Sequence, residues 1–307
     1  MSFTNLQIIK RFAEAKLTCP GSAGNVFYRG DDLYSYGTHF RLAIRKKFGK
    51  GVEFLVNGDV YSPSTSKHTS LVIQNCRPNV QIPFSALYSA DILPGGIQII
   101  DWSMDKSWYT CPKCGREVAG IWEGMPHKDD RTPICLDDDG EPSAPKWNHI
   151  LGSVIFKYEN KTYLSSTDEQ EKGRTAYFLC MLPKNVRTIN DAYEVLIPKI
   201  VKEAIGAGVD VKRQGDYYFI PTTIENSLET KRPKNSALIL RDERIEKSSH
   251  VASFYVKMHR IIYVRGTIFH SPIAREGTHK NLYLKNVWHV PVKNMAVQGW
   301  TARGNVD

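Results

Sequence analysis

The chain has 307 residues, of which 41% are hydrophobic and 24% are charged, and its formal net charge is +9. This composition matches folded soluble proteins, so it excludes a mainly disordered or collagen-like chain. No uninterrupted apolar stretch reaches the length of a membrane span, and Lys10 and Arg11 interrupt the apolar start of the chain. We therefore expect neither a transmembrane helix nor a secretory signal, and a cytoplasmic protein.

The first part of the chain predicts one helix, a run of short strands and a second helix. Thr4 and Gln7 have the spacing of a capping box, which predicts a helix that continues to about Leu17. Its apolar face is expected to comprise Leu6, Ile9 and Phe12. Strands are predicted at 26–29, 33–36, 40–46, 52–56 and 97–102, separated by glycine-containing turns. Ser64 or Thr65 is expected to cap a helix that reaches Cys76.

The segment 111–150 differs in charge from its flanks. It carries −3, whereas residues 1–110 carry +4 and residues 151–307 carry +8. Its aspartates and prolines indicate a loop-rich insertion. We therefore divide the chain into an N-terminal α+β domain (1–110), an acidic cysteine-containing insertion that resembles a zinc ribbon (111–150) and a C-terminal β-rich α+β domain (151–307).

The last part of the chain is expected to be rich in strands. A hairpin is predicted around Glu159-Asn160, a buried strand at 176–182, one helix over 192–204 and further strands from 210 to about 292. Strands that alternate regularly with long helices, as in a parallel sheet, are missing. The predicted fold class is α+β, mostly antiparallel β with few helices, in two lobes with a loop-rich zinc-binding insertion.

The cysteines indicate a metal site more than a disulfide framework. A long chain without an export signal is expected to keep its thiols reduced. Cys111 and Cys114 are two residues apart, a spacing at which two thiolates bind one zinc ion, and Cys135 is the natural third ligand. His127 or His149 completes a structural Cys3His site. The alternative is a pair of ordinary free cysteines in a loop.

The positive charge favours a polyanionic partner, of which nucleic acid is the commonest. In the predicted strand 40–46, Arg41, Ala43 and Arg45 alternate with apolar residues, so they are expected to share an open face of a sheet. Basic side chains on such a face bind phosphates, and nearby tyrosines stack on bases. The candidate nucleic-acid-binding residues are Tyr34, Tyr36, Arg41, Arg45, Lys46, Lys47 and Lys67. The alternative is a solvated face with ordinary strand tyrosines.

Residues 64–68, Ser-Thr-Ser-Lys-His, allow two interpretations. Hydroxyl groups and free N–H groups at a helix start, together with Lys67, form a possible phosphate site. Plain N-capping explains the same residues without a ligand, and we favour it slightly.

Five of the nine histidines lie between His250 and His289. If their strands are neighbours, His250, His270 and perhaps His289 converge into a catalytic set for metal-independent phosphodiester cleavage. Isolated histidines in strands are more often structural. The phosphate-binding loop, dinucleotide-binding and nucleophile-elbow motifs are all absent from the sequence, which disfavours those enzyme classes.

Several short stretches resemble uncharacterised proteins encoded by bacteriophages and mobile elements. The stretches are residues 33–40 (LYSYGTHF), 65–68 (TSKH), 213–216 (RQGD) with 219–221 (FIP), and 264–270 (VRGTIFH). The resemblance implies a viral or mobile-element origin and action in a bacterial cytoplasm. It implies no established activity and no catalytic roles.

The sequence thus favours a nucleic-acid-binding protein, for DNA or RNA, with a structural zinc ion. One alternative is a histidine-dependent nuclease or other phosphodiester-processing enzyme. Another is an interaction protein that binds a host factor.

Overall fold

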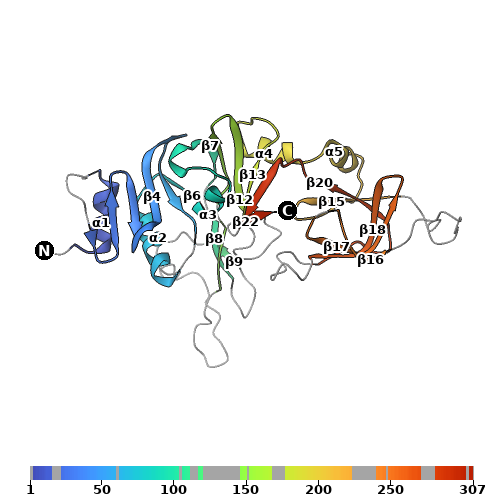
Figure 1. Cartoon of the computed structure of the whole chain (residues 1–307), viewed down its shortest axis with the longest axis horizontal. Helices are drawn as coiled ribbons and strands as arrows, with labels where there is room; N and C mark the ends of the chain where they lie inside the picture. Colours follow the sequence, from blue (N-terminus) through green and yellow to red (C-terminus); the bar gives the residue numbers. More distant parts are fainter. Residues whose placement is uncertain are drawn as a thin grey trace, which may run out of the picture.

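The computed structural model describes the chain at residues 3–15, 22–59, 62–103, 106–110, 117–119, 146–150, 152–167, 177–222, 240–246, 248–270, 281–301 and 304–306. These residues form five α-helices and four β-sheets (Figure 1). All described strand pairs are antiparallel except one. The predicted class, α+β with mostly antiparallel strands, is confirmed.

Helix α1 (Asn5–Ala13) begins as predicted and ends earlier. Thr4 and Gln7 form the full capping box. The buried face comprises Ile8, Ile9 and Phe12, whereas Leu6 is 36% exposed. The expected apolar face was therefore wrong at one position, because Ile8 and not Leu6 lies over the first sheet.

The first sheet has six strands in sequence order. They are β1 (Ser22–Ala23), β2 (Val26–Arg29), β3 (Asp32–Ser35), β4 (Gly37–Gly49), β5 (Val52–Asn57) and β6 (Asn79–Ile82). Strand β6 pairs with β5 in parallel, and α2 (Pro63–Asn75) forms the crossover between them. The short helix α3 (Phe84–Ser89) follows β6. The sequence had indicated neither β6 nor α3.

Helix α2 supports the capping interpretation of its first turn. Its N-cap is Ser62, which precedes both predicted positions, Ser64 and Thr65, and the Ser62 hydroxyl accepts the N–H of Thr65 at 3.2 Å. Pro63 occupies the first helical position, where its missing N–H costs nothing.

A second sheet has the order β22-β21-β13-β12-β11-β7. Its strands are β7 (Gln98–Trp102), β11 (Val154–Tyr158), β12 (Lys161–Thr167), β13 (Tyr177–Met181), β21 (Gln298–Thr301) and β22 (Gly304–Val306). Phe156 faces a core shared with Ile44 and Leu55 of the first sheet. Its neighbour Ile155 faces the opposite side and packs near Leu196 of α4 (Ile189–Leu196). The layers are therefore helices, sheet, sheet and helix, which we call the sandwich.

The sandwich draws on both of the large predicted domains. Its shared core combines residues of the first 99 positions with Val154, Phe156 and Trp300. The first helices and strands lie at one end of an elongated molecule, and the last strands return to the middle (Figure 1).

A third sheet, which we call the C-terminal sheet, has seven strands and lies at the other end of the molecule (Figure 1). They are β14 (Lys212–Gln214), β15 (Tyr217–Pro221), β16 (Leu240–Arg244), β17 (His250–Met258), β18 (Ile261–His270), β19 (Leu282–Tyr283) and β20 (His289–Lys293). Alternating side chains form two clusters: Tyr255 and Val264 belong to the larger, and Val256 and Tyr263 to the smaller.

The segment 111–150, predicted as a loop-rich insertion, contributes β9 (Glu117–Ala119) and β10 (Lys146–Ile150), which pair with β8 (Lys106–Thr110) in a small sheet. One prediction for the middle of the chain needs correction. The predicted helix over 192–204 is two helices, α4 and α5 (Lys199–Gly206). Pro198 separates them, because proline has no N–H to donate and holds the preceding residue in an extended conformation. None of the described helices has both the length and the apolar composition to cross a bilayer.

Candidate nucleic-acid interface

The first sheet does not expose the basic face predicted for β4. Ala43 is fully buried in the cluster that α1 and α2 cover. Arg45 lies at the margin of that cluster, where its guanidinium donates to Asp31 Oδ1 at 3.0 Å and to the Phe12 carbonyl at 3.4 Å. The expectation of an open face was wrong because the two helices pack on it, and Arg45 makes contacts within the chain.

Arg41 and Tyr34 also contact other residues of the first sheet. Arg41 Nε lies 3.3 Å from Asp32 Oδ1, and Arg41 Cζ lies 5.8 Å from the centre of the Tyr34 ring. Tyr34 is only 8% exposed and stacks on Phe27 with 5.3 Å between ring centroids. Its ring therefore lies between Phe27 and Arg41.

The three predicted lysines differ in their surroundings. Lys46 Nζ donates to the Gly95 carbonyl and lies 5.3 Å from the centre of the Phe48 ring. Lys47 on β4 and Lys67 on α2 are exposed. These two side chains present their charge to solvent.

Tyr36 is the exposed aromatic residue of the predicted set. It connects β3 to β4, and its backbone has a φ of 61°. This value is in the left-handed region, which residues other than glycine rarely adopt. Its N–H donates to the Asn25 carbonyl at 2.6 Å, which holds the backbone in this conformation. The side chain is 52% exposed. Backbone strain of this kind costs about 1–3 kcal/mol and is concentrated at functional positions.

The Tyr36 ring packs against a histidine that belongs to a buried polar network. The Tyr36 ring lies 5.7 Å from the ring of His68 on α2. His68 Nδ1 is 2.8 Å from Ser35 Oγ, and His68 Nε2 is 3.0 Å from Asn5 Nδ2. Because an amide NH2 donates, Nε2 accepts and Nδ1–H donates to the Ser35 hydroxyl. Burial lowers the pKa of His68, which favours this neutral form. We call these four residues the Tyr36 platform.

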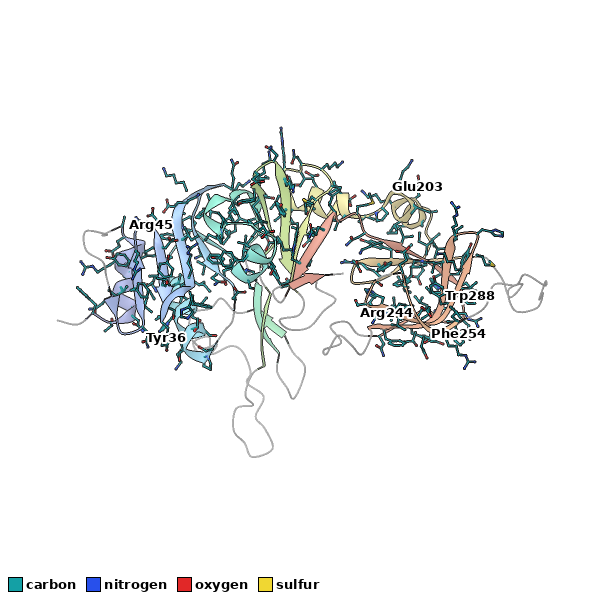
Figure 2. The ribbon with its side chains drawn as sticks, viewed as in Figure 1. Tyr36, Arg45, Glu203, Arg244, Phe254 and Trp288 are labelled. Atoms are coloured by element: carbon teal, nitrogen blue, oxygen red, sulfur yellow. The ribbon has the colours of Figure 1, made fainter. Side chains whose placement is uncertain are left out.

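The predicted basic and aromatic residues do not form one patch. Figure 2 shows Arg45 and Tyr36 on opposite sides of the N-terminal region, with Tyr36 beside α2. Lys67 precedes His68 on that helix. The structure thus groups Tyr36 with the start of α2 and separates it from Arg45.

The structure separates the predicted catalytic histidines into two places. His250 on β17 and His270 on β18 are cross-strand partners. His289 on β20 is opposite Val264, which lies six positions from His270 on β18, or about 20 Å along a strand. The three histidines therefore do not converge as a set.

The surroundings of His250 contain residues that the sequence did not single out. His250 is 3% exposed, its Nδ1 lies 3.9 Å from Asp216 Oδ1, and its ring meets Tyr217 edge-on at 5.2 Å. Lys293 Nζ lies 3.4 Å from the other Asp216 oxygen. Burial raises the pKa of Asp216, while Lys293 opposes that shift. At the other place, His289 Nδ1 is 2.8 Å from the Val287 carbonyl, and burial lowers the pKa of His289.

The predicted zinc ligands Cys111, Cys114, His127 and Cys135 lie outside the described residues, and so does the side chain of His149. Within the described part of the chain, no three histidine, cysteine or acidic side chains are grouped as metal ligands. Cys76 and Cys180 are buried free thiols, and burial raises the pKa of each to about 12.

A cationic and aromatic group on the C-terminal sheet was missed by the sequence interpretation. The group has one residue on each of four neighbouring segments. They are Arg241 on β16, Phe254 on β17, Arg265 on β18 and Trp288 directly before β20. The Arg241 Cζ is 5.7 Å from the Phe254 ring centre, and the Arg265 Cζ is 5.1 Å from Phe254 and 4.8 Å from Trp288. We call these residues the arginine–aromatic row. The sequence shows each residue in a strand pattern, but only the pairing register brings the four together.

Comparison with protein-family models, curated proteins and solved structures gave no match to this chain.

Proposed function

We propose that this chain is a nucleic-acid-binding protein and that the Tyr36 platform is one of its contact points. The observation that carries the proposal is the half-exposed Tyr36 ring in a left-handed backbone conformation. An aromatic ring presented in this way offers a surface on which an unpaired base stacks, a contact worth about 1–3 kcal/mol per base.

Charge supports the same proposal. The net charge of +9 attracts a polyanion, and the exposed Lys67 lies next to His68 in the chain. Lys47 supplies a second exposed cation on β4. Both were predicted as phosphate contacts, and both keep that role in the proposal. The proposal also retains the structural zinc ion and an origin in a bacteriophage or mobile element.

A salt titration of oligonucleotide binding tests the proposal. Affinity for single-stranded DNA or RNA should fall steeply as salt rises, because each phosphate contact releases bound counterions. Tyr36→Ala should weaken binding by about 5- to 100-fold, the range expected for one lost stacking contact. Tyr88→Ala is the matched control, because Tyr88 is similarly exposed, at 48%, on α3. Undetectable binding at about 50 mM salt, where phosphate contacts dominate, rejects the proposal.

The second candidate function is phosphodiester cleavage, and the pair of His250 and Asp216 favours it. An imidazole near a carboxylate and a lysine is a common acid–base arrangement. Incubation of a labelled RNA with wild type and with His250→Asn tests it. Loss of cleavage with an unchanged melting temperature supports an enzyme, and equal cleavage by both proteins means that His250 is structural.

A further inference from the structure

The arginine–aromatic row is a continuous line of stacked groups across the C-terminal sheet. Arg241 is the cross-strand partner of Phe254, and Phe254 is the partner of Arg265. Val264 pairs with His289, so the preceding residue, Trp288, comes opposite Arg265. Neighbouring strands lie about 4.8 Å apart, which is a suitable spacing for flat groups stacked side by side.

Gly266 allows the backbone of β18 to lie close to Phe254. Its φ of 84° is in the left-handed region, and the strand pairing shifts register at this point. A Cβ atom on Gly266 would lie 3.2 Å from Phe254 Cδ2. The backbone thus approaches Phe254 closely and leaves its ring between the two guanidinium groups.

The row lies on the sheet face of the smaller apolar cluster, with exposure increasing toward one end. Trp288 is 2% exposed, Phe254 and Arg265 are half-buried, and Arg241 is exposed. Figure 2 shows Phe254 and Trp288 together at the outer part of the C-terminal sheet. Arg241 lies on β16, the last strand in the sheet order. The exposed end of the row is therefore a guanidinium plane at a sheet edge.

Aromatic contacts affect an arginine differently from carboxylate contacts. Arg41 and Arg45 of the first sheet each lie within 3.3 Å of an aspartate oxygen, which offsets their charge. A ring face fixes the orientation of a guanidinium without cancelling its charge, and it leaves the N–H edges directed sideways. The contact of Arg241 with the Phe254 ring therefore orients a planar cation that fits an anionic and flat partner.

Trp288 gives a second indication of a partner. Its indole N–H is buried and has no hydrogen-bond acceptor among the residues that the structure describes. A buried donor without an acceptor is unusual in a folded protein. Its ring lies beside Arg265, so this unpaired donor is at the buried end of the row.

We propose that the arginine–aromatic row binds single-stranded nucleic acid, with an unpaired base stacked on the outer plane of Arg241 and a phosphate held near Arg265. This inference rests on the proposed nucleic-acid-binding function and adds a second contact surface and a preference for single strands over duplex. A duplex buries its base faces within its own stack, so it cannot extend the row. An acidic protein supplies carboxylates but no flat bases, so the stacked geometry favours nucleic acid.

The experiment compares a 12-nucleotide labelled single strand with the duplex of the same sequence by fluorescence anisotropy. Arg241→Gln should weaken single-strand binding by about 5- to 20-fold. Arg241→Lys keeps the charge and removes the plane, so it should also weaken single-strand binding while duplex affinity stays within about twofold. Arg187→Gln is the matched control, because Arg187 is an exposed arginine outside the C-terminal sheet. Melting temperatures of all variants check that Arg241, which is exposed, is dispensable for folding.

The outcomes separate this inference from the proposed function. Wild type that binds duplex as tightly as single strand, or Arg241→Lys that binds as wild type does, overturns the role of the row but leaves nucleic-acid binding in place. An equal loss of single-strand affinity in Arg187→Gln would mean that overall charge causes the effect, and it also overturns the role of the row. Binding of polyglutamate with the same affinity and the same dependence on Arg241 shows a general acidic partner instead. No binding to either oligonucleotide rejects the proposed function and this inference together.

Discussion

The Tyr36 platform contains one residue in the left-handed backbone region and the arginine–aromatic row lies beside another, and the two residues are of different types. Gly266 beside the row adopts φ 84° without a side chain, whereas Tyr36 adopts φ 61° with a large one. Glycine enters this region at little cost, and tyrosine does not. The comparison teaches that the same backbone region allows a close approach to Phe254 at Gly266 and presents a half-exposed ring at Tyr36.

The largest effect is expected at Gly266. Gly266→Ala should lower the free energy of unfolding by about 2–3 kcal/mol, because the left-handed conformation strains alanine and its Cβ approaches Phe254 to 3.2 Å. Urea unfolding measures the change. Gly206→Ala is the control, because nothing lies within 4 Å of a Cβ at that position and it should be almost neutral. Equal stability of the two variants would contradict the packing described for the row.

The next largest effect on stability is expected at the hydrogen bond between His68 and Ser35. His68→Leu should lower the free energy of unfolding by about 2 kcal/mol, because it leaves the fully buried Ser35 hydroxyl without its partner. The double variant with Ser35→Ala should recover part of this loss, since no buried hydroxyl then remains unpaired. Urea unfolding of both variants measures the recovery, and its absence would mean that His68 acts by packing alone.

A smaller effect is expected for Tyr36 itself. Tyr36→Asn should leave the free energy of unfolding unchanged or raise it by up to about 1 kcal/mol, because asparagine tolerates the left-handed region. The same variant should lose oligonucleotide affinity, since the stacking ring is gone. Calorimetry and anisotropy on one preparation measure both. A stability loss of more than about 1 kcal/mol would show that Tyr36 is there for folding.

Protonation should act on the platform through His68. Burial lowers the pKa of His68 and of His289, so below the ordinary value of 6.5 these two side chains bind more protons in the unfolded chain than in the folded chain. Their contribution to stability should be level above about pH 7.5 and fall as pH decreases through 6.5. Urea unfolding at several pH values measures this slope. In His68→Leu the slope should be shallower, and an unchanged slope would assign it to other groups.

The smallest effect on either surface is expected from metal removal. Cys111, Cys114 and Cys135 lie in the segment 111–150, which contains no residue of the platform or the row. Elemental analysis of the purified protein should find about one zinc ion per chain. Chelation should remove the zinc and leave oligonucleotide affinity within about twofold. Protein that contains no zinc, or that loses binding on chelation, would contradict this separation.

Local signals made the fold class and several elements predictable. The capping box at Thr4 placed the start of α1, and strand alternation placed β2 and β5 within a residue of their observed limits. Pro198 also indicated a helix boundary, but the apolar residues kept their helical spacing on both sides of the proline. The pattern therefore predicted one helix instead of two. Such features depend only on nearby residues.

Pairing between distant strands was not predictable from the sequence. The alternation of β4 predicted that Leu42 and Ala43 face opposite sides, but both belong to the cluster that α1 and α2 cover, and the pairing with β3 shifts register at this point. The strand pattern places Tyr34 and Tyr36 on the same face and does not distinguish them, but Tyr34 is 8% exposed and Tyr36 is 52% exposed. The arginine–aromatic row depends on the register of four segments, which no single segment specifies.

The return of the chain to the sandwich through β21 constrains the order of assembly during synthesis. Strand β21 pairs with β13, and Trp300 on it is buried in the core that joins the two sheets. A ribosome must therefore complete all the strands of the C-terminal sheet before the partners of Trp300, such as Tyr163, can be enclosed. During that interval the nascent chain exposes an unfinished sheet edge and apolar surface, and this exposure, which favours aggregation, ends only when residue 300 has emerged.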